Sequence, residues 1–282
     1  MRNPQRAQKI AFFFLFLATL LIVVPVGLVV FIIIQKGLPA INWQFLTDIP
    51  RQGMRQGGIF PAIVGTLYLV LGAIVFALPI GLLSAIYLSE YAKDNFLSRL
   101  VKLAIVNLAG VPSVVYGLFG LALFVVFLKF GVSILSGALT LGIMILPIII
   151  TTSREALESV PYSFREVSLS LGASRWQTIR HVVLPNALPG ILTGTILGLG
   201  RAAGETAPIL FTVAAFYLPS LPRSIFDQAM ALPYHLYVIS TQVPNVDEKI
   251  RYGTALVLLA LVLFMNLVAI IIRYQFRKRK KW

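Results

Sequence analysis

The chain has 282 residues, of which 58% are hydrophobic and 12% are charged, and its mean hydropathy is +0.89. A soluble protein carries about a quarter charged residues, so this composition excludes an ordinary water-exposed surface. The net charge of +14 would suit a nucleic-acid partner, but the basic residues lie between long apolar runs and at the chain ends, as in membrane proteins. The absence of cysteine excludes disulfides, thiolate metal sites and a cysteine nucleophile.

Six apolar runs are long enough to cross a bilayer, because a helix needs about 20 residues to span the hydrocarbon core. We therefore expect an all-α membrane protein with six transmembrane helices, in contact with lipid and without a nucleic-acid partner. The first run is too long for the core of a signal peptide, which favours a retained anchor. The runs cover residues 10–34, 57–89, 103–128, 130–153, 187–216 and 252–272.

The distribution of Lys and Arg predicts how these helices are oriented. Sixteen of them lie at the two chain ends and in the 89–102 and 154–186 loops, against seven in the other three loops. By the positive-inside rule, both termini face the cytoplasm and the protein lies as a multi-pass protein in the plasma (cytoplasmic or inner) membrane.

The same runs divide the chain into three parts. The outer loop of the second part contains four prolines and is expected to be irregular or amphipathic. The parts are residues 1–56 (tail, first transmembrane helix and outer loop), residues 57–276 (five transmembrane helices, with inner loop 154–186 and outer loop 217–251) and the basic tail 277–282.

The inner loop carries the strongest helix signals outside the apolar runs. Residues 163–166 and 174–177 both fit the capping box that begins a helix. Gly172 can supply the left-handed conformation that ends the first helix, and Pro185 is expected to end the second. We predict two short cytoplasmic helices hinged at Gly172. They could dock into a groove on a partner protein, or form an interfacial amphipathic loop with no partner.

The fifth run contains a charged pair, with Arg201 near its middle and Glu205 one helical turn later. Either charge at the bilayer centre would cost roughly 3 kcal/mol, and residues at i and i+4 can pair on one helix face. The planar donors of a guanidinium suit a tetrahedral oxyanion. We predict that Arg201 lines an anion path and that Glu205 holds its rotamer; the alternative is a structural pair against another helix. Pro208 should kink this helix.

Two runs carry small residues at every fourth position, which predicts faces where helices approach closely. The positions are Gly190, Gly194, Gly198 and Ala202 in the fifth run, and Ala73, Ala77, Gly81 and Ala85 in the second.

Motifs for chemistry are missing from the sequence. It has no G-x-x-x-x-G-K-[ST] loop for ATP, no nucleophile elbow and no zinc-protease motif. His181 and His235 fall in loops on opposite sides of the membrane, so they cannot share a metal. We predict that the chain is not an enzyme and binds neither a metal nor a cofactor.

The inner loop resembles the cytoplasmic motif of ABC importer permeases, E-A-A, three residues, G, nine residues, I-x-L-P. Its spacing is kept, while Val167 and Ser168 replace the alanines and Val182 replaces the isoleucine. The resemblance implies a type I ABC importer permease fold, with a coupling helix between helices four and five seated in a cleft of the nucleotide-binding subunit. The residues implied in coupling are Glu166, Gly172, Ala173, Ser174, Leu184 and Pro185.

Residues 200–212, G-R-A-A-G-E-T-A-P-I-L-F-T, resemble the signature of phosphate ABC transporter permeases of the A type (PstA). Residues 58–63 (G-I-F-P-A-I) and 232–235 (L-P-Y-H) also resemble that family. The resemblance covers most of the chain from about Gly57 onward. It implies a substrate pathway that includes Arg201, Glu205 and Thr206.

The resemblance also implies the partners of an ATP-driven phosphate importer. They are a second permease of the C type, a dimer of ATP-binding subunits that hydrolyse ATP, and an extracytoplasmic phosphate-binding protein. A permease for another oxyanion, such as phosphonate or molybdate, is the alternative within the superfamily. A self-sufficient anion channel or proton-coupled carrier is the alternative from another class, although the inverted repeats expected of a carrier are missing from the sequence.

Overall fold

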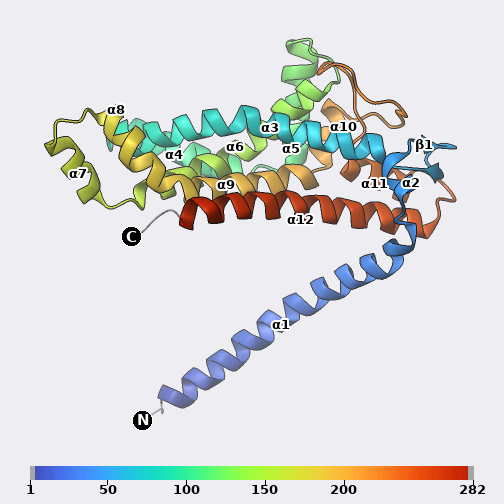
Figure 1. The fold of residues 1–282 in the computed structure, drawn as a ribbon, viewed down its shortest axis with the longest axis horizontal. Coiled ribbons are helices and arrows are strands. Elements are labelled where there is room, and N and C mark those ends of the chain that lie inside the picture. Colours follow the sequence, from blue (N-terminus) through green and yellow to red (C-terminus); the bar gives the residue numbers. More distant parts are fainter. Residues whose placement is uncertain (1–3, 279–282) are drawn as a thin grey trace.

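The computed structural model describes residues 4–278, and helices make up most of it (Figure 1). The basic tail expected at 277–282 falls largely on residues 279–282, which lie outside the described part. The long helices are α1 (Pro4–Gly37), α3 (Phe60–Ile86), α6 (Ile134–Glu158), α9 (Leu184–Gly204) and α12 (Glu248–Lys278). The shorter ones are α2 (Trp43–Thr47), α4 (Phe96–Ala109), α5 (Ser113–Gly120), α7 (Tyr162–Ser170), α8 (Arg175–Thr178), α10 (Ala207–Thr212) and α11 (Leu232–Thr241).

Three π-helical segments and a 3-10 turn extend or join these helices. The π segments are η2 (Tyr87–Tyr91), η3 (Leu121–Phe127) and η4 (Ile179–Val183), and the 3-10 turn is η1 (Leu38–Ala40). The described part also contains a small antiparallel hairpin formed by β1 (Pro50–Arg51) and β2 (Gln56–Gly57). Its two-residue strands leave the all-α prediction intact.

Five helical runs in the described part are long and apolar enough to cross a membrane. They overlap five of the six predicted spans, although the run at Arg175–Gly204 lies earlier in the chain than the predicted 187–216. The remaining predicted span corresponds to a bent helix pair, so the count of six holds when that pair is taken as one span. Their bounds are Ala11–Ala40, Phe60–Tyr91, Ile134–Glu158, Arg175–Gly204 and Glu248–Phe276.

The third predicted span is not one continuous helix. The chain turns by 103° between α4 and the run formed by α5 and η3. The turn falls at Gly110–Pro112, where Pro112 lacks an N–H and disfavours the helical conformation at Val111. The span predicted at 103–128 is therefore a bent helix pair, a feature that the absence of charge in this run does not indicate.

Helices α3, α6 and α9 form the centre of the bundle and confirm both predicted small-residue faces. A Cβ atom added to Gly190 would approach Ala156, and one added to Gly194 would overlap the hydroxyl of Thr152, both on α6. Ala73 and Ala77 of α3 are fully buried. Small side chains therefore let both α3 and α9 pack closely against α6.

Helix α1 diverges from the bundle and approaches it at its C-terminal end (Figure 1). There the backbone of Gly37 lies so close to Tyr252 that a Cβ atom would come within 2.5 Å of its carbonyl oxygen. The Nζ of Lys36 lies 2.7 Å from the Oε1 of Glu248. The rest of the helix presents large apolar side chains outward, as expected of a helix that faces lipid or another transmembrane helix.

The two ends of the bundle differ. Helices α7 and α8 lie at one end, and α2, β1 and α11 lie at the other (Figure 1). The loop expected to be irregular over 217–251 contains α11, whose first residues, Leu232–His235, are buried. At this end Thr66 of α3 accepts a hydrogen bond from the backbone N–H of Leu232 at 2.8 Å.

Burial lowers the pKa of His235 in α11 to about 4 from the ordinary value of 6.5. Its side chain is 3% exposed, and its Nδ1 has no hydrogen-bond partner among the described residues. The unfolded chain therefore binds a proton between pH 6.5 and pH 4 that the folded chain excludes, so stability falls as the pH drops through this window. We expect the free energy of unfolding to fall by roughly 3 kcal/mol across it.

Thermal unfolding of the purified protein in detergent, measured from pH 7 to pH 4, checks this prediction. His235→Phe keeps a ring of similar size and should remove most of the pH dependence. His181→Gln is the matched control, because it removes the other histidine of the chain, which is exposed. An unchanged pH dependence in His235→Phe would assign the effect to other groups.

Candidate functional site

Arg201 and Glu205 lie at a break in the fifth span. Helix α9 ends at Gly204, Glu205 is extended with φ −77° and ψ 135°, and α10 begins at Ala207. Arg201 is therefore in the last turn of α9, and the expectation that it lies near the middle of the fifth span is wrong. The cause is Pro208, whose ring would clash with the carbonyl of Gly204 in a continuous helix. The predicted kink is a complete break.

The predicted pairing of the two charges is confirmed by their distance. The Nε of Arg201 lies 3.5 Å from the Oε1 of Glu205, and the side chains are 31% and 18% exposed. Among the described residues, the two Nη atoms of Arg201 have no recorded hydrogen bond. A loosely held, partly exposed guanidinium keeps donors for an incoming oxyanion.

Thr206 lies directly after this pair and precedes α10. Its side chain is half-buried and does not cap α10. The break thus brings the three predicted pathway residues, Arg201, Glu205 and Thr206, into one irregular turn. Irregular backbone at membrane depth is tolerated where protein or a water-filled cavity covers it.

The other broken span packs beside this turn. A Cβ atom on Gly117 of α5 would lie 3.0 Å from the Cα of Pro208 and 3.1 Å from the carbonyl oxygen of Ala207. Tyr116 lies within electrostatic range of Arg201, and its hydroxyl donates to the carbonyl of Leu108 across the bend at 2.7 Å. Sequence reasoning missed this neighbourhood, although Pro112 was a signal for it.

The inner loop contains the two predicted short helices, with a different start for the first. Helix α7 begins at Tyr162 after Pro161, and no side chain caps it. The capping box expected at 163–166 is therefore wrong, because Pro161 starts the helix two residues before the predicted cap at Ser163. Glu166 is exposed on α7.

Gly172 ends α7 as predicted. Its φ is +84°, in the left-handed region that glycine adopts without strain. The N–H of Gly172 donates to the carbonyl of Leu169 at 2.9 Å, and that of Ala173 donates to Ser168 at 3.2 Å. These two bonds form a Schellman motif, which satisfies the last carbonyls of the helix.

The second capping box is confirmed at the start of α8. Ser174 donates its backbone N–H to Oε1 of Gln177 at 2.8 Å, and Gln177 donates its own to Oγ of Ser174 at 3.3 Å. The hydroxyls of Ser168 and Thr178 lie 2.9 Å apart and join α7 to α8. The two short helices therefore form one connected unit.

The expectation that Pro185 ends the second helix is wrong. The helix runs from α8 through the π segment η4 into α9, where Pro185 lies in the first turn. Pro185 has no N–H to donate to the carbonyl of His181, four residues earlier. The wider π turn before it accommodates the proline without ending the helix. Leu184 packs into an apolar cluster at this end of the bundle, and Pro185 is exposed. Helices α8 and α9 are thus joined through η4 into one helical run, Arg175–Gly204.

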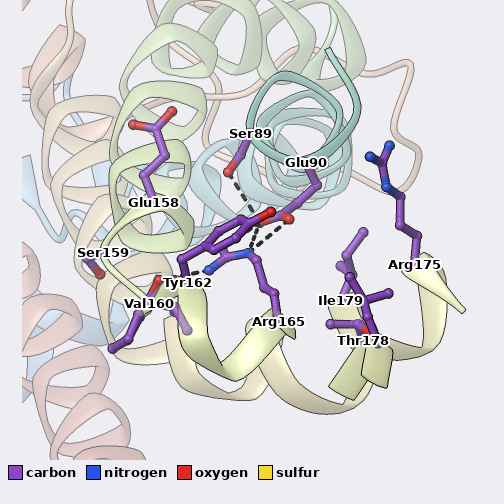
Figure 2. Close-up of a pocket in the computed structure, with 12 residues that line it drawn as sticks. Ser89, Glu90, Glu158, Ser159, Val160, Tyr162, Arg165, Arg175, Thr178 and Ile179 are labelled. Carbon is purple, nitrogen blue, oxygen red and sulfur yellow. Dashed lines mark hydrogen bonds and ion pairs between the residues drawn. The ribbon is translucent and has the colours of Figure 1, made fainter. Parts of the chain in front are cut away.

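A polar cavity of about 510 Å³ lies between the inner loop and the end of α3 (Figure 2). Arg165 of α7 and Glu90 of η2 meet in its wall, with Nη2 2.6 Å from Oε1. Sequence reasoning missed this pair, because no local pattern links two residues 75 positions apart.

Residues 77–282 match the model of a family described as binding-protein-dependent transport system inner membrane components. The chain belongs to this family. It is accordingly a membrane subunit of an ABC importer and not itself an enzyme, as predicted. The predicted multi-pass membrane location agrees with this membership.

Relatives cover almost the whole chain. One is the probable ABC transporter permease protein YqgI of Bacillus subtilis (strain 168), 35% identical over 266 residues, with 89% of this chain and 90% of that protein covered. Another is the phosphate transport system permease protein PstA 1 of Mycobacterium tuberculosis (strain H37Rv), 34% identical over 279 residues, with 97% and 90% covered. The resemblance to A-type permeases is confirmed by such relatives.

A solved structure confirms the importer permease fold. A bacterial alginate ABC transporter, in complex with its alginate pentasaccharide-bound periplasmic protein, contains a chain that is 16% identical to this one. The TM-score is 0.62, and the match covers 99% of this permease and 95% of that chain.

Proposed function

We propose that this permease conducts inorganic phosphate inward, as one of two membrane subunits of an ATP-driven importer. The observation that carries the proposal is the turn at 201–206. A guanidinium with unused donors lies there at a break in a transmembrane helix, paired at 3.5 Å with one carboxylate. That arrangement suits a doubly charged tetrahedral oxyanion, and the relative PstA 1 is named for phosphate transport.

In this proposal phosphate passes Arg201 through a brief contact. Glu205 restrains the guanidinium and reduces its positive field, so the anion binds weakly enough to leave. A tight site in the middle of the pathway would trap the ion that it should release. Thr206 adds a hydroxyl that can donate to a phosphate oxygen.

The proposed assembly follows from the loops at the two ends. A second permease of the C type completes the pathway, and a dimer of ATP-binding subunits sits at the cytoplasmic end with both termini of this chain. An extracytoplasmic phosphate-binding protein delivers the ion at the end with α2, β1 and α11. Glu166, Gly172, Ala173, Ser174, Leu184 and Pro185 lie in or beside the unit that would meet the ATPase.

Competition for uptake tests the substrate. We expect proteoliposomes that hold the assembled complex, with ATP inside and the binding protein outside, to accumulate labelled phosphate, with no competition from excess sulfate or molybdate. Strong competition by molybdate or a phosphonate, or no phosphate uptake by an assembled and ATP-hydrolysing complex, would reassign the substrate to another oxyanion.

A further inference from the structure

The Arg165–Glu90 pair stands apart from the other ion pairs of the described residues by its burial. Both of its side chains are 11% exposed, whereas the surface pair of Arg99 and Asp94 is 71% exposed on each side. A buried charge pair is retained against a large desolvation cost, and removing one partner leaves the other charge uncompensated. This burial indicates that the Arg165–Glu90 pair holds structural elements together, which a solvent-exposed pair does only weakly.

The guanidinium of Arg165 joins three elements. Its Nε and Nη2 contact the carboxylate of Glu90 at 3.1 and 2.6 Å, in the two-pronged geometry typical of arginine and carboxylate. Its Nη1 donates to the carbonyl of Val160 at 2.8 Å, and Nη2 also donates to that of Leu157 at 2.9 Å. Leu157 lies in the last turn of α6, where helix carbonyls lack partners within the helix, and Val160 lies just beyond the end of α6. A lysine could not reach all of these acceptors.

The pair lies beside an apolar cluster that fixes the same elements. Ile86 of α3, Leu157 of α6 and Ile179 of η4 are buried there, with Phe164 of α7 packed against them. Packed interiors of this kind transmit displacement because they deform little. Figure 2 shows Arg165 rising from α7 towards Glu90 at the end of α3.

The opposite side of the inner loop is open. Val167 of α7 and Leu171, which follows α7, are 61% and 83% exposed, and Glu166 of α7 is also exposed. The loop therefore has an outward side available to a partner and an inward side anchored through Arg165.

We propose that Arg165 and Glu90 form a rigid clamp that makes α7 move together with the cytoplasmic ends of α3 and α6. The inference rests on the proposed docking of this loop on the ATPase. It names the contact that transmits a movement of the docked loop to the membrane-spanning helices. Arg165 and Glu90 are positioning residues in this account, since neither lies at the turn around Arg201.

The first test measures phosphate transported per ATP hydrolysed by the reconstituted four-component complex. Arg165→Gln and Glu90→Gln should each lower this ratio about tenfold while ATP hydrolysis continues. The double variant should lose no more than the worse single variant, because both act through one contact. Arg99→Gln removes an exposed arginine with the same two-pronged geometry and should leave the ratio unchanged. A normal ratio in Arg165→Gln, or losses that multiply in the double variant, would overturn the clamp.

A second test keeps both Arg165 and Glu90. It therefore does not depend on whether Arg165→Gln and Glu90→Gln assemble. The chain has no cysteine, so spin labels can be placed at Tyr91→Cys and Ser163→Cys without background. We expect the distance distribution between the labels to be the same in the nucleotide-free and ATP-bound complex. A shift between these states would show that α7 moves relative to α3 and would contradict the proposal. Failure of the wild-type complex to import phosphate would instead contradict the proposed substrate, since the label distances are measured without transport.

Discussion

Replacing Arg201 by alanine is expected to lower ATP-dependent phosphate uptake by about a hundredfold or more, because the turn at 201–206 loses its charged donor for the anion. Assembly should survive, since Arg201 is 31% exposed and its ion pair with Glu205 is 3.5 Å long. Its loss therefore leaves no deeply buried charge without a partner. Labelled-phosphate uptake into proteoliposomes, with size-exclusion chromatography of the complex, measures both effects.

Arg273→Ala is the matched control for this variant. Arg273 also projects from a transmembrane helix, and its Nη1 lies 3.1 Å from the hydroxyl of Thr193 on α9, far along the helix from the turn. We expect this variant to retain most of the uptake. Normal uptake in Arg201→Ala would show that Arg201 and Glu205 form a structural pair.

Replacing Gly172 by proline is expected to uncouple ATP hydrolysis from transport. Proline holds φ near −65°, which the φ of +84° at this position forbids, and it removes the N–H that donates to Leu169. The Schellman turn would have to rearrange, and α7 would change its direction relative to α8. We expect phosphate transported per ATP to fall about tenfold while ATP hydrolysis remains measurable.

Gly131→Pro controls for the backbone effect alone. Gly131 also has a positive φ, of +69°, and, as at Gly172, an added Cβ would meet no atom within 4 Å. It lies before α6, away from the inner loop, so the ratio of phosphate to ATP should stay near the wild-type value. Equal losses in both variants, or normal coupling in Gly172→Pro, would refute the assignment of the inner loop to coupling.

Features set by local chemistry were predictable from the sequence. Runs without charge gave the spans, since lipid excludes charged side chains over that length. The small residue Gly194 indicated close approach to α6, and Gly172 indicated a left-handed helix end; both follow from the size or backbone freedom of one residue.

Features set by tertiary structure were not predictable in the same way. The 103° bend at Gly110–Pro112 lies in a uniformly apolar run, where Pro112 signals a break in the helix and the direction of the chain after it is set by packing. Pro185 was expected to end a helix, but a π turn before it lets the helix continue. The pairing of Arg165 with Glu90 depends on how α3 and α7 are brought together, which no local pattern records.

The dependence of phosphate uptake on ATP and on the partner subunits tests the central claim most directly. Proteoliposomes should contain this permease alone, or with a C-type permease, the ATP-binding subunits and the phosphate-binding protein, each with and without ATP. We predict uptake when all components and ATP are present, and background uptake in every other case. Phosphate uptake by this chain without ATP or partners would contradict the account and identify a channel or carrier.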